Sequence, residues 1–443
     1  MTALRAAGAT GAVAAQAWSP VTLLAFRFCV VWLGLYCLLW TYIPFALLGV
    51  AGRWVREYPG PWNTPFTDPV TGWVGRVFFG VDAVVRTDSG AGDQAAMWVL
   101  TCCVLVVALV ATAVWSILDR RTAYPRLWAW FALALRLCLG ATMLGFGFAK
   151  VFPTQMPGPS LAQLLQPYGE FSPASVLWLQ VGSSAPYEIA LGAVEVAAGL
   201  LLFVPRTAVL GAMATCAAMA QVLLLNLTFD IPEKLLAAHL LLMSLVLLAP
   251  ALRPLTGLFL RSRACPPLTT PALFTADHKN RAAALAQLVL GLWVAFGCGY
   301  DRWVVWQDQY GAARATSPLY GIWDVSTFTL DGQPVPALIT DEIRWRRIVF
   351  DDPGTATYQR MDGELVASRA EFGADGRLRL TETAGAAAPF ATLTPDRVSP
   401  DRLLLRGELS GHAVVLTLDR VDPNTFTLRS RGFHWVQDYP YFR

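Results

Sequence analysis

Charged residues are scarce in this sequence. Asp, Glu, Lys and Arg make up 15% of the 443 residues, hydrophobic residues make up 55%, and the formal net charge is only +3. A soluble protein of this length needs more charge than that to cover its surface. The small net charge also argues against nucleic acid as a partner. The sequence therefore indicates an integral membrane protein, with the lipid bilayer as its main partner.

Residues that bind metals or form disulfides are few or poorly spaced. The four histidines lie far apart, so no pair has the spacing of a zinc or haem site. The eight cysteines include no CxxC pair, and we interpret them as small apolar side chains. No GxSxG, P-loop or dinucleotide-binding motif is present. The sequence thus predicts no metal and no certain cofactor, and it leaves open whether the protein is an enzyme.

Long apolar stretches fill the first 300 residues. A helix needs about 20 mainly apolar residues to cross a bilayer. Suitable stretches run over Val21–Val50, Ala95–Leu118, Leu127–Val151, Pro186–Val204, Thr207–Leu227, Pro232–Leu248 and Arg281–Gly299. The sequence therefore predicts a membrane α-helical bundle of about seven transmembrane helices.

The distribution of Lys and Arg among the short loops predicts the orientation of these helices. Three arginines follow the second stretch, and the loop before the seventh carries five basic residues. The segment Pro153–Ala185 has neither Lys nor Arg. We therefore expect a cytoplasmic N-terminus in a bacterial plasma (inner) membrane, and a periplasmic or extracellular C-terminal domain.

Two segments on the expected outer side look amphipathic. Apolar residues recur at helical spacing in Trp73–Val85, and Leu161–Val181 mixes leucines and aromatic residues with Pro and Gly. Such segments favour the membrane surface. Packing against the helix bundle would explain the same pattern, so both interpretations stay open at this point.

From about Leu319 the apolar residues alternate with polar ones, as in strands. The expected strands are Ile322–Leu330, Glu342–Phe350, Thr355–Arg360, Leu365–Phe372, Arg377–Thr383, Ala391–Leu393, Arg402–Leu409, His412–Asp419 and Phe426–Ser430. Asp-Gly and Ser-Gly pairs between them are typical of hairpin turns. The pattern predicts an antiparallel β-barrel or sandwich. The opening Gly321-Ile322-Trp323 resembles the Gly-x-Trp of lipocalin-like barrels, which implies that Arg429 or Arg431 stacks on the indole.

Ionisable residues inside a membrane are costly and are therefore candidates for function. Arg136 and Glu195 are expected at similar depth on adjacent helices. A buried Arg136–Glu195 ion pair would make both charges tolerable. Such a pair could be purely structural and fix the register of the two helices, or it could belong to a site.

Four further polar residues are expected near the outer boundary at comparable depth: Lys150, Glu188, Asn226 and His239. Trp178 and Tyr187 lie near them in sequence. Lys150 could simply extend to the headgroups, and His239 could donate a hydrogen bond between helices. The functional interpretation treats Glu188 and His239 as catalytic, and Lys150, Asn226, Trp178 and Tyr187 as a binding site for a substrate or quinone.

The segment from Arg136 to about Leu260 combines small and polar residues with apolar runs. They are Leu135-Arg136-Leu137, Gly145 to Lys150, Glu188, Gly192, Glu195, Gly199 to Leu202, Pro205 to Ala208, and His239 with the run to Leu248. With these residues the segment resembles the DoxX-like membrane family. The resemblance implies a four-helix membrane module and a link to quinone chemistry, since the family takes its name from a subunit of a thiosulfate:quinone oxidoreductase.

These observations divide the chain into four expected segments. They are an N-terminal pair of helices with an external loop (1–126), a DoxX-like module (127–260), a cytoplasmic loop with the seventh helix and a linker (261–318), and an external lipocalin-like domain (319–443). The leading hypothesis is an accessory or quinone-linked subunit of an envelope redox system. The alternative is a non-enzymatic carrier or assembly factor that binds a lipid, another lipophilic small molecule or a protein partner in the envelope through its β-domain. A transporter is disfavoured because no pair of broken helices occurs in matching halves.

Overall fold

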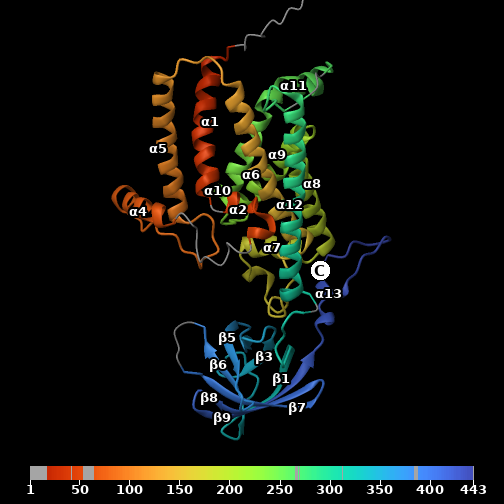
Figure 1. The fold of residues 1–443 in the computed structure, drawn as a ribbon. Helices are drawn as coiled ribbons and strands as arrows, with labels where there is room; N and C mark the ends of the chain where they lie inside the picture. Colours follow the sequence, from red (N-terminus) through yellow and green to blue (C-terminus); the bar gives the residue numbers. More distant parts are fainter. Residues whose placement is uncertain are drawn as a thin grey trace, which may run out of the picture. The chain divides into compact units, whose positions relative to one another are not determined.

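The computed structural model describes residues 17–40, 42–52, 64–264, 268, 270–311, 313–383 and 388–442. These residues divide into two compact units, whose helices and strands are labelled in Figure 1. The first unit comprises the chain up to Phe152 and from Glu188 to Trp303. The second comprises Pro153–Tyr187 and the chain from Val304 onward. The four-segment division expected from the sequence stays a prediction.

The first unit is helical. In the described part of the chain, 7 helices are long and apolar enough to cross a membrane. They are α1 (Pro20–Leu39), α5 (Ala95–Leu118), α6 (Pro125–Val151), α8 (Ala185–Phe203), α9 (Ala208–Thr228), the span Lys234–Arg261 formed by α10 (Lys234–Leu248), η4 (Ala249–Ala251) and α11 (Leu252–Arg261), and α12 (Asp277–Gln309), which continues into the second unit. The predicted membrane bundle is confirmed.

The first helix is shorter than the apolar stretch that predicts it. The Ser19 hydroxyl accepts a hydrogen bond from the Thr22 amide at 3.2 Å and so caps the start of α1. The helix ends at Leu39, and the short helices α2 (Tyr42–Ala46) and η1 (Gly49–Ala51) follow. Gly49 has a φ of 55°, and a Cβ there would lie 2.8 Å from Nε1 of Trp293. The tight contact with α12 therefore requires glycine at this turn.

Helices α6 and α8 pack closely because each carries two glycines seven residues apart. A Cβ on Gly147 would lie 2.9 Å from the Gly192 carbonyl oxygen, and one on Gly192 would lie 2.5 Å from that of Gly147. Gly140 and Gly199 meet in the same way, with a Cβ on Gly199 2.9 Å from the Gly140 carbonyl oxygen. Small residues at both contacts allow the backbones to touch, which is how helices associate in lipid.

A buried arginine joins α1 to the connection between α5 and α6. The Arg27 guanidinium donates to the Tyr124 hydroxyl at 2.8 Å, to the Ser116 hydroxyl at 2.9 Å and to the Asp119 carbonyl at 2.9 Å. The Asp119 carbonyl lies just beyond the end of α5, where helical backbone carbonyls lack intrahelical partners. Arg27 thus fastens α1 to the α5–α6 connection.

Helix α4 (Thr64–Val74) and the π-helical turn η2 (Gly75–Phe79) form the first half of the amphipathic segment Trp73–Val85, and the helix ends at Gly80, which has a positive φ. The segment packs against α5, with Val74 and Val85 in the contact. The other side of the segment is open, because Val77 and Phe78 are 58% and 68% exposed. One side of this segment therefore packs on the bundle, and its exposed apolar side keeps the predicted membrane contact open.

The second unit contains a closed antiparallel barrel of eight strands, with the short β2 (Gln333–Pro334) added to β1. The eight are β1 (Gly321–Leu330), β3 (Trp345–Phe350), β4 (Thr355–Arg360), β5 (Leu365–Phe372), β6 (Leu378–Glu382), β7 (Ala391–Ser399), β8 (Arg402–Leu409) and β9 (His412–Val421). Each barrel strand pairs with the next along the chain, and β9 returns to pair with β1, so a sandwich is excluded.

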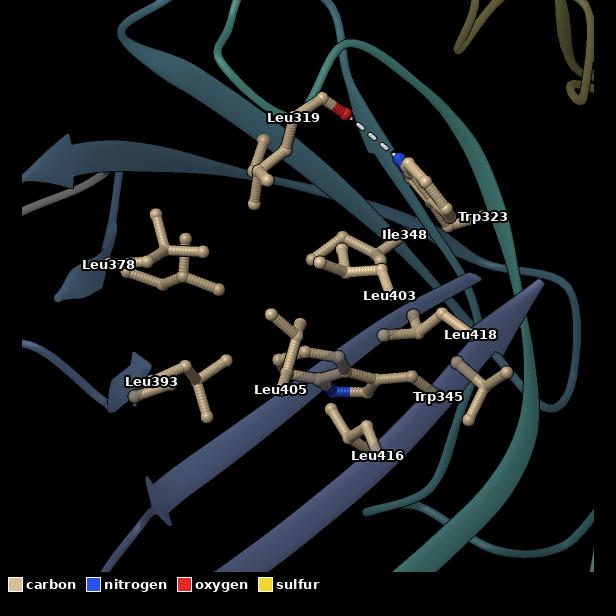
Figure 2. Close-up of a cluster of buried hydrophobic side chains, with 14 of the residues drawn as sticks. Leu319, Trp323, Trp345, Ile348, Leu378, Leu393, Leu403, Leu405, Leu416 and Leu418 are labelled. Atoms are coloured by element: carbon tan, nitrogen blue, oxygen red, sulfur yellow. Dashed lines mark hydrogen bonds between the residues drawn. The ribbon is translucent and has the colours of Figure 1, made fainter. Parts of the chain in front are cut away.

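Side chains from all eight strands fill the barrel interior. Figure 2 shows leucines and tryptophans from several strands converging on one cluster. Trp323 is fully buried, and its indole N–H donates to the Leu319 carbonyl at 2.8 Å. Trp345 is buried in the same cluster. An eight-stranded barrel leaves an interior that side chains can fill, and here they do so.

Two details of the β-domain differ from expectation. The residues predicted as a ninth strand, Phe426–Ser430, contain the short helix α13 (Thr427–Ser430), which follows the turn η5 (Pro423–Thr425), since β9 already closes the sheet. The cation above Trp323 is Arg397 of β7, at 5.9 Å from the ring centroid. Arg429 instead donates to the Pro159 carbonyl at 3.0 Å, and Arg431 lies over the ring of Tyr441.

The second amphipathic segment belongs to the barrel unit. It contains η3 (Tyr168–Glu170) and α7 (Pro173–Gly182). Leu161, which precedes them, is buried against Ile322 and Val349, and its amide donates to the Asp351 carboxylate at 3.1 Å. This end of the segment therefore packs on the barrel wall, an interpretation that the sequence did not suggest.

Candidate functional site

The buried acid of α8 pairs with a different cation from the one expected. Nζ of Lys150 lies 2.6 Å from Oε2 of Glu195, and the two side chains are 7% and 6% exposed. The predicted Arg136–Glu195 ion pair is wrong. Lys150 begins on a turn nearer the end of α6, but helical side chains lean toward the N-terminus of their helix, and lysine is long. Its ammonium therefore reaches the level of Glu195.

Arg136 interacts with a helix end and not with a carboxylate. Its Nε and Nη2 atoms donate to the Leu202 carbonyl at 3.0 and 2.7 Å, and Nη2 donates to Oε1 of Gln287 at 3.1 Å. Leu202 lies in the last turn of α8, whose carbonyls have no intrahelical partner and carry the negative end of the helix dipole. A guanidinium suits this position, so Arg136 joins α6, α8 and α12.

Asn226 and a nearby acid hold together the turn between α9 and α10. The Asn226 amide donates to the Glu233 carbonyl at 3.0 Å. Asp93, from another loop, accepts hydrogen bonds from the amides of Lys234 and Leu235 at 2.7 and 2.9 Å and so caps α10. Burial and the neighbouring Asp93 carboxylate raise the pKa of Glu233 to about 7. Asn226 therefore has a structural role in this turn.

His239 stacks on an aromatic face of α1. Its ring is nearly parallel to that of Tyr36, with centroids 3.9 Å apart. The rings of Trp32 and Trp40 lie 5.6 and 6.0 Å from it. His239 Nδ1 lies 2.7 Å from the Leu235 carbonyl oxygen, so Nδ1 carries the proton and Nε2 is the acceptor in neutral imidazole. The four-residue spacing of Trp32 and Tyr36 on α1 and of Trp40 at its C-cap could have revealed this face from the sequence.

One donor on this aromatic face has no acceptor. The Trp32 indole N–H is buried and has no hydrogen-bond partner among the described residues. A buried donor without a partner costs about 1–3 kcal/mol, and such a group in a folded protein calls for an explanation. Trp32 therefore offers a hydrogen bond beside the ring of His239, on a surface lined by flat rings.

The remaining predicted site residues divide between the two units. Glu188 is 1% exposed in the first turn of α8. Trp178 and Tyr187 belong to the second unit. The Trp178 indole donates to the Gln155 carbonyl at 2.9 Å, and Tyr187 is 45% exposed. The structure thus joins Lys150 to Glu195 and His239 to α1. The binding and catalytic roles predicted for these residues remain predictions.

Comparison with known proteins finds similarity over part of the chain. The chain is 32% identical over 133 residues to the uncharacterized protein YwoB of Bacillus subtilis (strain 168), and the match covers 28% of this chain and 79% of that protein. No family model matches the chain, and no solved structure matches it.

Proposed function

Over the matched segment the chain belongs to the same family as YwoB, and we propose that its transmembrane unit binds a quinone as a quinone-linked or accessory subunit of an envelope redox system. The observation that carries this proposal is the unpartnered Trp32 indole N–H beside the stacked imidazole of His239. A quinone headgroup is a flat ring with two carbonyl oxygens, which accept hydrogen bonds. The resemblance to DoxX-like proteins supports the same class of ligand.

The polar groups on this face suit both the oxidised quinone, which has carbonyl oxygens, and the reduced quinol, which has hydroxyl groups. The Trp32 indole donates a hydrogen bond to a carbonyl oxygen. Nε2 of neutral His239 accepts one from a hydroxyl, because Nδ1–H is committed to the Leu235 carbonyl. The rings of Tyr36 and Trp40 extend the flat apolar surface. Trp32 as a residue is only half-buried, so a lipophile can contact its ring from the bilayer, and neighbouring side chains must move to uncover its indole N–H.

This proposal moves the binding groups away from those expected from the sequence. The ammonium of Lys150 is committed to Glu195, and the amide of Asn226 is committed to the α9–α10 turn. Neither therefore serves as the main donor. His239 stays in the proposed site, but here it accepts a proton instead of donating a hydrogen bond, and Glu188 remains the other catalytic candidate in the same unit.

The orientation and location belong to the same proposal. The loops rich in Lys and Arg favour a cytoplasmic N-terminus in a bacterium and a β-barrel outside the plasma membrane. A redox partner in the envelope would then meet the barrel. The barrel interior is filled by buried side chains such as Trp323 and Phe350. The filled interior leaves little room for a lipid. The second candidate function is therefore docking of a protein partner on the barrel, and not carriage of a lipid inside it.

The test compares Trp32→Phe with Trp98→Phe. The first variant keeps an aromatic ring and loses the donor, and the second alters a tryptophan of α5 that is 48% exposed. We expect Trp32→Phe to weaken binding of decylubiquinone by roughly threefold to tenfold, the value of one hydrogen bond. Trp98→Phe should bind like the wild type. Equal binding by both variants would refute the site, and no binding by the wild type would refute the function.

A further inference from the structure

Two cysteine thiols meet between α1 and α6. The side chains of Cys37 and Cys138 are close enough to interact with each other. Both pack against the same buried cluster, which contains Tyr36 and Trp40. Both are free thiols. Two thiols that interact directly are the arrangement from which a disulfide forms, and the product has its Cβ atoms about 3.5–4.5 Å apart. The long sequence separation explains why no cysteine motif reveals the pair.

The thiol pair adjoins the aromatic face that holds His239. Cys37 follows Tyr36 in the chain, and the Tyr36 ring stacks on His239. Trp40 connects the thiols with the aromatic face, since its ring stacks on Tyr36 and its side chain belongs to the cluster against which both cysteines pack. A dithiol, a base and a flat surface with an unpartnered donor therefore share one wall of the bundle.

We propose that Cys37 and Cys138 are a dithiol–disulfide pair that reduces the quinone bound at Trp32 and His239, an inference that rests on the proposed function. Both S–H bonds break and one Sγ–Sγ bond forms. The pair loses two electrons and two protons, and the quinone gains both and becomes a quinol. Nε2 of His239 takes up one thiol proton and passes it to a quinone oxygen, because the thiolate and not the thiol is the nucleophile.

The experiment uses a full-length variant that keeps Cys37 and Cys138 and has alanine at every other cysteine. The reduced protein in detergent is exposed to decylubiquinone, denatured, and labelled with a maleimide–polyethylene glycol. We expect about a tenfold fall in labelling. For a two-electron exchange, this ratio corresponds to a reduction potential of the disulfide that is roughly 30 mV below that of the quinone. In the unmodified chain, mass spectrometry should find the peptides of these two residues cross-linked, which covers the case in which the alanine variant folds poorly.

A matched control keeps Cys29 and Cys138. Cys29 lies on the same helix eight residues earlier, about 12 Å along its axis, and should stay fully labelled. His239→Ala should slow oxidation of the pair by decylubiquinone much more than oxidation by diamide, because both reactions need a thiol to lose its proton but only the quinone also needs the binding site.

The outcomes separate this inference from the proposed function. If decylubiquinone binds but both thiols remain labelled, the dithiol step is wrong and the quinone site stands. If diamide joins the thiols but decylubiquinone neither binds nor oxidises them, the proposed function is wrong and the quinone step falls with it. If diamide also fails to join them, the redox pair is wrong.

Discussion

Lys150 and Glu195 form an ion pair with a separation of 2.6 Å between α6 and α8. Both are buried, so removal of either partner leaves a charge without compensation. We expect Glu195→Ala to lower the free energy of unfolding by about 3–5 kcal/mol. The double change Lys150→Met with Glu195→Leu should recover most of that loss. Denaturant unfolding in detergent measures both effects.

The control for this prediction is Arg136→Leu combined with Glu195→Leu. That pair was expected from the sequence, but Arg136 bonds to the Leu202 carbonyl. The combination should therefore be at least as unstable as Glu195→Leu alone. Recovery by this double variant, and not by the Lys150 double, would contradict the observed pairing.

The glycine contacts between α6 and α8 predict a second effect. In Gly192→Ala the new Cβ would lie 2.5 Å from the Gly147 carbonyl oxygen, so the helices must separate. We expect a loss of about 1–3 kcal/mol in the free energy of unfolding, as for overpacked cores. Gly145→Ala in α6 is the matched control, because a Cβ added at Gly145 would meet nothing within 4 Å. If both alanines are tolerated equally, the close approach is not needed for stability.

The turn before α10 predicts a pH dependence. The pKa of Glu233 is raised from 4.5 to about 7, first by burial and then by Asp93. The folded state thus binds this proton more tightly than the unfolded chain does. The resulting stability is fully present below about pH 4.5 and is lost as the pH rises through about 7. The melting temperature in detergent should therefore decrease as the pH rises between these values.

Glu233→Gln should flatten that dependence, because glutamine does not titrate. Asp230→Asn serves as the control, since the Asp230 side chain is 87% exposed and pairs only with Lys234 among the described residues. If the pH dependence persists in Glu233→Gln and disappears in Asp230→Asn, then Asp230 and not Glu233 produces it, and the prediction is wrong.

The orientation in the membrane is tested by reporter fusions. A fusion after Arg443 should report an external C-terminus, and fusions within Ser262–Asn280 should report a cytoplasmic loop, because basic residues are retained on the cytoplasmic side. An external location for Ser262–Asn280 would reverse the proposed topology and with it the placement of the barrel.

The elements of this fold follow from local patterns, which explains why most were predictable. Apolar runs of sufficient length marked every transmembrane helix found in the described residues, and the boundaries of Ala95–Leu118, Leu365–Phe372 and Arg402–Leu409 were predicted without error. Asp331-Gly332 is the turn expected, with positive φ at both residues. The end of α1 was missed because an apolar composition continues through the turn that follows it.

The partners of the buried polar residues could not be predicted in the same way. Depth along a helix can be estimated from the sequence, but rotation about the helix axis and the reach of a side chain cannot. The cation Arg136 was matched to an acid at its depth, whereas the free carbonyl of a helix end satisfied it. Cys37 and Cys138 come together only once α1 lies against α6, so their contact depends on tertiary packing alone.

Closure of the barrel has a consequence for biosynthesis. Ile322 pairs with Val421, so the first strand of the barrel must wait for the last one to be made. At about 5–20 residues per second, β1 remains without its second neighbour for roughly 5–20 s. An unpaired strand edge is a template for aggregation. The newly made domain therefore passes through an interval in which protection of β1 by a chaperone would decide its yield.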